Sequence, residues 1–198
     1  MKYYFLFIVL SFSICNSQET FEYANLGFSI KKPKDWITAE QGEAIKNLQR
    51  NVTLDSSTIK KLIENNKGTI EIVTFYKYPI SNHAGVIPTI KVNLRYKGAS
   101  TFAAFKNSII KSYSAIKDIF PDFTFLTEPN SIVIDGKESV YSVSSYTLET
   151  INGEEKVKIW VYAIPVNDNF YQITFMDSED EDNSLVFESI AKSIRIRK

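Results

Sequence analysis

The sequence contains one cysteine, Cys15, and one histidine, His83, in 198 residues. Protein zinc sites need several Cys or His ligands, and a histidine that acts as a general base needs an oriented partner. No second histidine and no cysteine after residue 15 could share a metal ion with His83. We therefore expect His83 to be an ordinary loop residue, and we expect no metal site, no cofactor and no disulfide framework.

Blocks of like charge and clusters of glycine are also missing. The 23 basic and 23 acidic side chains are interspersed, so the chain lacks the basic stripe that neutralises nucleic-acid phosphates and the polybasic patch that attracts anionic membranes. The 7 glycines stand singly, which excludes a glycine-rich phosphate loop and a nucleophile elbow. The sequence therefore predicts no catalytic residues, no nucleic-acid partner and a protein that is not an enzyme.

A long apolar run occurs only at the N-terminus. Lys2 precedes the apolar stretch from Tyr3 to Ile14, and Ser17 is small, which is typical of a signal peptide over residues 1–17 that is cleaved before Gln18. Cleavage before Cys15, which would leave a lipid anchor on Cys15, is an open alternative, although Ile14 is bulkier than such sites prefer. We expect a single exported domain of residues 18–198, periplasmic or secreted and monomeric, with no transmembrane segment.

Strand-like runs and short polar turns alternate between residues 131 and 176. The runs are rich in Val, Ile, Tyr and Trp, which suit a pleated and half-buried surface. They end at Asp-Gly, Asn-Gly and Asn-Asp pairs, which tolerate the positive φ of hairpin turns. The runs are residues 132–134, 140–148, 157–164 and 170–176. This pattern predicts an antiparallel meander.

Two earlier strands and one long helix complete the predicted core. Phe105, Ile109 and Tyr113 belong to an apolar stripe with spacings of three and four residues, which predicts a helix over residues 100–118 that is capped by Ser100. The prediction is one α+β domain with this helix on one face of the sheet and these three side chains buried. The antiparallel sheet includes residues 69–78, 88–96, 138–150, 156–165 and 169–176.

Shorter elements are predicted at both ends of the domain. Residues 28–30 alternate as a strand, Thr38 begins a helix that runs to about residue 50, and Asp55 begins a second helix. Ser178 and Glu181 fit a capping box for a helix that contains residues 185–191, and a last strand follows at residues 194–196. The acidic run of residues 179–182 lacks the spaced ligands of a calcium loop, so we interpret it as charge that stabilises a helix N-terminus.

Several segments together resemble the PsbP-like superfamily. They are the opening segment from Gly27 to Trp36, the strand entry Pro88-Thr89-Ile90, the long helix that ends before Pro121, the turn after Ile134, and the closing residues 187–195. In order, they cover nearly all of residues 20 to 198. The resemblance implies an antiparallel sheet sandwiched between helical layers (α/β/α), as in PsbP accessory proteins and small exported bacterial proteins. It also implies a protein that is not a classical enzyme.

Three functions remain open at this point. The first is a non-catalytic accessory or binding domain that acts through protein contacts at the cell envelope. The second is a carrier of a small ligand in a pocket between sheet and helix, and the third is an enzyme that uses carboxylates. Lys158, Trp160 and Tyr162 alternate away from their apolar neighbours, so if the domain has a protein partner we expect the interface on this solvent-facing side of the sheet. We favour the alternative that they lie beneath the second helical layer that the resemblance implies, because aromatic side chains are usually buried.

Overall fold

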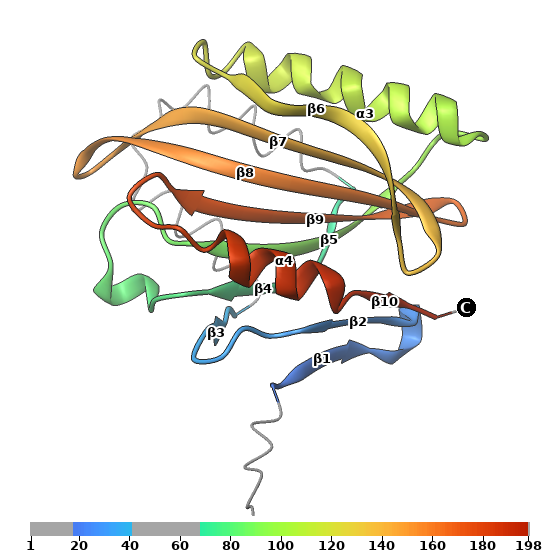
Figure 1. Cartoon of the computed structure of the whole chain (residues 1–198), viewed down its shortest axis with the longest axis horizontal. Coiled ribbons are helices and arrows are strands. Elements are labelled where there is room, and N and C mark those ends of the chain that lie inside the picture. Colours follow the sequence, from blue (N-terminus) through green and yellow to red (C-terminus); the bar gives the residue numbers. More distant parts are fainter. Residues whose placement is uncertain (1–17, 41–67, 198) are drawn as a thin grey trace, which may run out of the picture.

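The computed structural model of the chain describes residues 18–40 and 68–197. Its main feature is a seven-stranded sheet in the order β3-β4-β5-β9-β8-β7-β6, in which all neighbours are antiparallel (Figure 1). The strands are β3 (Ile37–Thr38), β4 (Ile70–Tyr76), β5 (Thr89–Tyr96), β6 (Thr124–Ile134), β7 (Lys137–Thr150), β8 (Gly153–Val166) and β9 (Asn169–Ser178). The predicted α+β fold with an antiparallel sheet is confirmed.

Tight turns set the register of the meander from β6 to β9. Asp135 and Gly136 have φ values of 46° and 74°, and positive φ at both central residues is what a type I′ hairpin turn requires. Asn167, in the turn between β8 and β9, also has a positive φ of 52°. β7 and β8 pair without a bulge. The turn residues that marked the predicted strand ends therefore lie in hairpin turns.

A second, three-stranded sheet joins the beginning and the end of the described chain. It has the order β1-β2-β10 and is antiparallel throughout. Its strands are β1 (Thr20–Tyr23), β2 (Phe28–Lys31) and β10 (Arg195–Ile196), and the 3-10 helices of the fold are η1 (Ala24–Leu26) and η2 (Ile80–Asn82). A Cβ on Gly27 would lie 2.4 Å from the carbonyl oxygen of Arg197, so only glycine allows this close approach.

The helix α3 (Phe102–Lys117) covers one face of the large sheet. Phe105, Ile109 and Tyr113 are buried, as predicted, against residues of β7, β8 and β9. The N-cap is Thr101, whose Oγ1 accepts a hydrogen bond from the amide of Ala104 at 3.2 Å. The prediction of Ser100 as the cap was therefore wrong by one residue, because extended backbone geometry continues to residue 101.

The helix α4 (Ser184–Lys192) covers the opposite face and crosses in front of the strands in Figure 1. Phe187 and Ile190 on its inner side are buried in a cluster that contains Trp36 and residues of β5, β8 and β9. Successive residues of a strand point to opposite faces, so Trp160 of β8 lies in the layer of α4, whereas Ala163 lies in the layer of α3. The predicted sheet between helical layers is thus confirmed.

The strand β6 is longer than the three residues that we predicted. It begins at Thr124 and includes Pro129, which made this stretch look unlike a strand. β6 is an edge strand, where a missing amide donor is tolerated, and its pairing with β7 shifts twice before residue 130. The helix predicted from residue 55 onward and residues 41–50 of the helix predicted to begin at Thr38 lie outside the described residues. The predicted start of that first helix was wrong, because Thr38 ends β3 and residues 39–40 are not helical. Neither α3 nor α4, the α-helices described, has the length and hydropathy to cross a membrane.

Candidate functional site

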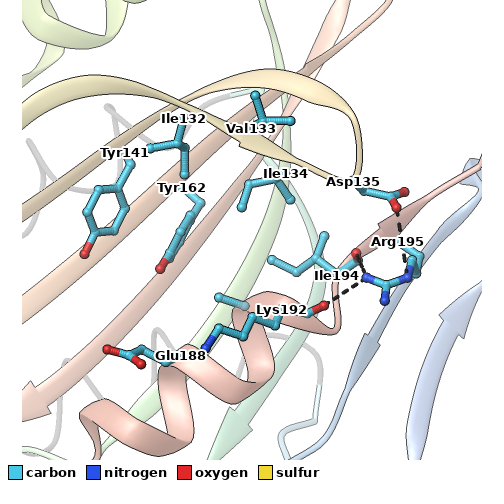
Figure 2. A pocket seen from close by; sticks show the side chains of 11 residues that line it. Ile132, Val133, Ile134, Asp135, Tyr141, Tyr162, Glu188, Lys192, Ile194 and Arg195 are labelled. Carbon is cyan, nitrogen blue, oxygen red and sulfur yellow. Dashed lines mark hydrogen bonds and ion pairs between the residues drawn. The ribbon is translucent and has the colours of Figure 1, made fainter.

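A pocket lies between α4 and the hairpin of β6 and β7, and we call it the α4 pocket. Its volume is about 420 Å³, which is within the range of sites that hold small molecules. Figure 2 shows its lining residues, which are Ile132, Val133, Ile134, Asp135, Tyr141, Tyr162, Glu188, Ala191, Lys192, Ile194 and Arg195. Most of the wall is therefore aliphatic or aromatic, and the charged side chains lie at its ends and along the helix.

The amphipathic character of α4 provides one wall of the pocket. Phe187 and Ile190 are buried beneath the helix, whereas Glu188 and Lys192 are exposed. Residues four apart lie on the same side of an α-helix, so both charged side chains border the same cavity. Figure 2 shows the side chain of Lys192 running along the helix toward Glu188.

One end of the α4 pocket is fixed by Asp135 in the β6–β7 turn. Its Oδ2 accepts a hydrogen bond from the amide of Ile196 at 2.7 Å, and its Oδ1 lies 4.0 Å from Nε of Arg195. The guanidinium of Arg195 also donates to the carbonyl oxygens of Lys192 and Ile194, at 2.9 and 2.7 Å (Figure 2). These bonds hold the hairpin against the end of α4, so both walls of the pocket have fixed positions.

Two tyrosines form the other end of the pocket. The rings of Tyr141 and Tyr162 have centroids 4.8 Å apart and are tilted by 43°. Burial raises the pKa of both phenols, and the carboxylate of Glu188 raises both further. The hydroxyl groups therefore remain neutral at physiological pH and can serve as hydrogen-bonding groups toward a ligand.

The predicted interface residues lie on the face that α4 covers. The ring of Trp160 is 9% exposed and packs edge-on against Phe187 at 5.2 Å, with Nζ of Lys158 4.7 Å from its centroid. Trp160 is therefore buried by the helical layer and does not face solvent, which contradicts the interface hypothesis for this residue. Tyr162 is half-buried and lines the α4 pocket. The alternative that these residues lie beneath a second helical layer describes Trp160 correctly.

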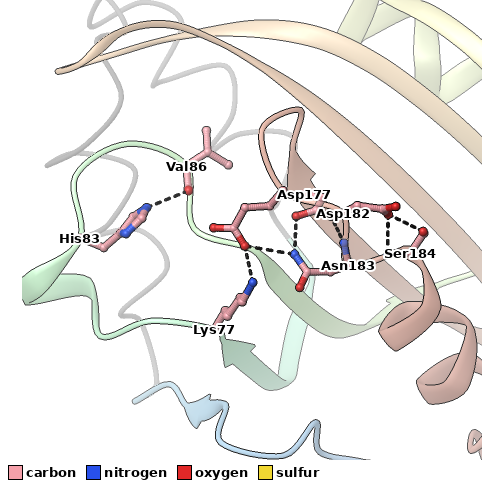
Figure 3. Close-up of polar contacts among 8 residues, drawn as sticks. Lys77, His83, Val86, Asp177, Asp182, Asn183 and Ser184 are labelled. Atoms are coloured by element: carbon pink, nitrogen blue, oxygen red, sulfur yellow. Dashed lines mark hydrogen bonds and ion pairs between the residues drawn. The ribbon is translucent and has the colours of Figure 1, made fainter.

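A polar network fixes the segment between β9 and α4 (Figure 3). Asp177 is 1% exposed and accepts hydrogen bonds from the amide and from Nδ2 of Asn183, at 2.7 and 2.8 Å. Burial raises the pKa of Asp177 despite these bonds. Glu181 forms an ion pair with Lys77. Burial of Glu181 opposes its ionisation, but hydrogen bonds from Lys77 and Asn183 lower its pKa overall.

The acidic run of residues 179–182 precedes α4 and does not form its first turn. The capping box predicted from Ser178 and Glu181 was wrong, because Ser178 is still paired in β9 and the helix begins at Ser184. Asp182 accepts hydrogen bonds from the amide and the hydroxyl of Ser184, and Glu179 lies 3.4 Å from Lys156. Within the described ranges, no group of three His, Cys, Asp or Glu side chains could hold a metal ion.

His83 lies in the loop between β4 and β5. Its ring is stacked on Tyr78 with centroids 4.9 Å apart, and its Nε2 lies 3.2 Å from the carbonyl oxygen of Val86 (Figure 3). The position of His83 agrees with the predicted loop residue. Cys15, the predicted alternative lipidation site, lies outside the described residues.

Sequence reasoning missed most of the α4 pocket. Tyr162 was predicted as part of an interface, but Ile132, Ile134, Glu188 and Lys192 were not singled out. The spacing of Glu188 and Lys192 on a predicted helix placed these two on one side of it. No local pattern indicated that the β6–β7 turn would lie beside them, because that contact joins segments that are far apart in the sequence.

Comparison with known proteins gives a fold. No family model matches the chain, and no curated protein matches it. The solution structure of cyanobacterial PsbP (CyanoP) from Synechocystis sp. PCC 6803 superposes with a TM-score of 0.55 at 11% identity, over 93% of this chain and 96% of CyanoP. At this identity the likeness shows a shared fold and nothing finer. The chain has the architecture of CyanoP, as the PsbP-like resemblance implied.

Two further solved structures are similar to this chain. A crystal structure from Bacteroides thetaiotaomicron VPI-5482 has a TM-score of 0.50 at 13% identity over 91% of this chain. The match spans 49% of that protein, so this chain corresponds to about half of it. LpqN, which is described as involved in cell envelope biogenesis of Mycobacterium tuberculosis, has a TM-score of 0.47 at 12% identity. The match spans 93% of this chain and 88% of LpqN.

Proposed function

We propose that this chain is an exported, non-catalytic binding domain of the PsbP-like type that holds a small, mostly apolar molecule in the α4 pocket. The observation that carries the proposal is the composition of the pocket wall. A cavity of about 420 Å³ has an aliphatic side formed by Ile132, Ile134 and Ile194 and a hydrogen-bonding end formed by Tyr141 and Tyr162. Small-molecule sites combine these two features, since apolar surface supplies affinity and a few polar groups fix the orientation.

The fixed geometry of the pocket also supports binding. Asp135 bonds the β6–β7 turn to β10, and Arg195 bonds the end of α4 to the same turn. A cavity whose walls are already in place avoids part of the ordering cost that binding otherwise involves. The bound molecule would replace solvent at the half-buried side chains of Ile132 and Ile134.

A binding role has more support than carboxylate catalysis. Asp177 and Glu181 both accept hydrogen bonds from Asn183, and Glu181 is also paired with Lys77. These bonds hold the segment that leads into α4, so both carboxylates already have structural partners. Asp135 likewise accepts a main-chain amide. The contacts of these three carboxylates with neighbouring segments therefore explain their positions.

Export is the part of the proposal that rests on sequence. The apolar stretch that follows Lys2, with small Ser17 before Gln18, is typical of a signal peptide. We place the mature domain in the periplasm or outside the cell, with a lipid anchor at Cys15 as the alternative. Mass measurement of the intact protein from its native host distinguishes cleavage before Gln18 from lipidation of Cys15.

A protein-binding role at the cell envelope is the second candidate. Leu126 and Leu185 are 55% and 80% exposed, and Leu126 lies with Ser184 at a second cavity beside the start of α4. Exposed leucines beside a cavity could contact a partner protein. This candidate predicts that Leu185→Ser abolishes capture of an envelope partner without any change in the α4 pocket.

Binding of a neutral fluorescent dye, phenylnaphthylamine, tests the ligand-binding proposal. We compare the native mature chain with Ile132→Trp, which places a larger ring in the pocket wall. The matched control is Ile110→Trp, because Ile110 is exposed on α3 and far from the pocket in the fold. The native chain and the Ile110 variant should bind equally, and the Ile132 variant should bind about tenfold more weakly, which corresponds to 1.4 kcal/mol.

Native mass spectrometry of the protein from its own host provides the complementary measurement. A small-molecule adduct should be present on the native chain and reduced on Ile132→Trp. If the dye binds all three proteins equally, or binds none of them, the α4 pocket is not a binding site and the proposal fails.

A further inference from the structure

The charge distribution around the α4 pocket identifies the chemistry of its ligand. We infer that the pocket takes an amphiphile with a cationic head group, such as a long-chain amine or a quaternary ammonium compound, and that the head group lies between the two tyrosines and Glu188. This inference rests on the proposed ligand-binding function. It adds the sign of the charge that the pocket selects.

The tyrosine end of the α4 pocket has a geometry that suits a positive group. Tyr141 and Tyr162 both line the cavity, and Figure 2 shows their hydroxyl groups pointing in the same direction, on the side of Glu188. Cations are attracted to the faces of tyrosine rings and to carboxylates. The adjacent rings, with centroids 4.8 Å apart, and the carboxylate would therefore act together on one positive group.

The electric field at the tyrosine end also favours a positive charge. Glu188 is the charged side chain that raises the pKa of both Tyr141 and Tyr162. A field that disfavours a phenolate disfavours the carboxylate or phosphate of an anionic ligand in the same place. The same field favours a positive charge. The tyrosine end therefore discriminates against anionic amphiphiles.

Arg195 is held by the framework of the pocket at two of its guanidinium nitrogens, Nη1 and Nε. Its guanidinium donates to the carbonyl oxygens of Lys192 and Ile194 and lies 4.0 Å from the carboxylate of Asp135. An anion bound at Nη1 or Nε would compete with these contacts, which hold the pocket together. Arg195 therefore belongs to the framework of the site.

Lys192 is the remaining cation, and its position makes the inference testable. Its side chain runs toward Glu188 in Figure 2, but neither of the two forms an ion pair within 4.0 Å among the described residues. A cationic ligand would compete with Lys192 for the field of Glu188. An anionic ligand would instead depend on Lys192, so removing Lys192 has opposite effects for the two ligand classes.

The experiment measures displacement of bound phenylnaphthylamine from the full mature chain by three amphiphiles of equal chain length, each below its micelle concentration. They are decyltrimethylammonium, decanoate and decanol. The ammonium compound should bind the native chain about tenfold more tightly than decanoate, a difference that cation–π and carboxylate contacts together can supply. Decanol should lie between them.

Two charge variants and one control complete the test. Glu188→Gln should weaken binding of the ammonium compound about fivefold, and Lys192→Met should strengthen it by a similar factor, while neither changes binding of decanol. Glu154→Gln, at the exposed start of β8, should change nothing. Vesicles that carry the same ammonium group show whether a lipid or a free molecule presents it, and capture by either supports the inference.

The outcomes separate the inference from the function on which it rests. If decanoate binds more tightly than the ammonium compound and Lys192→Met abolishes its binding, the pocket selects anions and the inference is overturned. Equal affinity for all three amphiphiles also overturns it, although the α4 pocket would still be a binding site. If phenylnaphthylamine itself does not bind, the proposed function fails first.

Discussion

Replacement of Trp160 by alanine should destabilise the domain by about 4 kcal/mol, because removing a buried tryptophan usually costs about 3–5 kcal/mol. The ring is 9% exposed, packs against Phe187 and Phe175 in one buried cluster, and has Nζ of Lys158 above it. Typical domains have a free energy of unfolding of about 5–15 kcal/mol, so the variant would lose a large part of its stability. Trp160→Phe keeps an aromatic ring at this position and should lose much less.

Urea unfolding followed by fluorescence measures this effect. The chain has 2 tryptophans, so a Trp36→Phe background makes Trp160 the single reporter, and the alanine variant is followed by circular dichroism. With an m-value of about 2 kcal/mol per molar urea, the midpoint should fall by about 2 M. Lys158→Met, which removes the cation above the ring and keeps an apolar side chain of similar length, should cost about 0.5–1 kcal/mol. A Trp160→Ala midpoint within about 0.3 M of the native value, together with loss of an envelope partner, would refute burial and restore the interface hypothesis.

Three further predictions concern other contacts. Gly85→Ala should cost about 3 kcal/mol, because φ is 86° and a Cβ would lie 2.1 Å from Oε1 of Glu155; in a Glu155→Ala background, urea unfolding should show a smaller loss. The pair of Lys77 and Glu181 should contribute about 1 kcal/mol at neutral pH. This stabilisation is lost as pH falls from 4.5 through the lowered pKa of Glu181, because the carboxylate becomes protonated. The unfolding free energies of Glu181→Gln and the native chain should therefore converge at the acid end of a pH series. Burial raises the pKa of Tyr162, so stability should fall as pH rises above 10.0; Tyr162→Phe should lessen that fall and remove one of the late-titrating phenols from an alkaline absorbance titration.

Local patterns predicted the strands whose pairing is also local. The Asp135-Gly136 turn and the β-branched runs on either side of it specify a hairpin within a few residues. Phe105, Ile109 and Tyr113 fall on one side of a helix by spacing alone. In each case, the residues that determine the structure are close together in the chain, so the sequence shows them together.

The remaining features depend on contacts that the sequence does not show. The first half of β6 resembles a polar loop because of Pro129, and pairing with β7 makes it a strand. The helix α4 begins later than predicted, because β9 continues to Ser178, which pairs with Val157 of β8. The burial of Trp160 depends on which face α4 covers. The α4 pocket depends on the face that α4 covers and on the position of the β6–β7 turn. Alternation along β8 alone could single out Tyr162 as a site residue, but it could not indicate the cavity around it.

The pairing of β2 with β10 also determines when the fold can be completed. β10 contains Arg195 and Ile196, near the end of the chain, while its partner β2 lies near the beginning. The smaller sheet and the hydrogen bond between Asp135 and Ile196 cannot form until residues 195 and 196 have been synthesised. Contacts between distant segments also slow folding, because the intervening chain must be ordered before they form. A nascent chain that emerges residue by residue therefore has an incomplete smaller sheet, and lacks the hydrogen bond from Ile196 to Asp135 at the α4 pocket, until residues 195 and 196 have emerged.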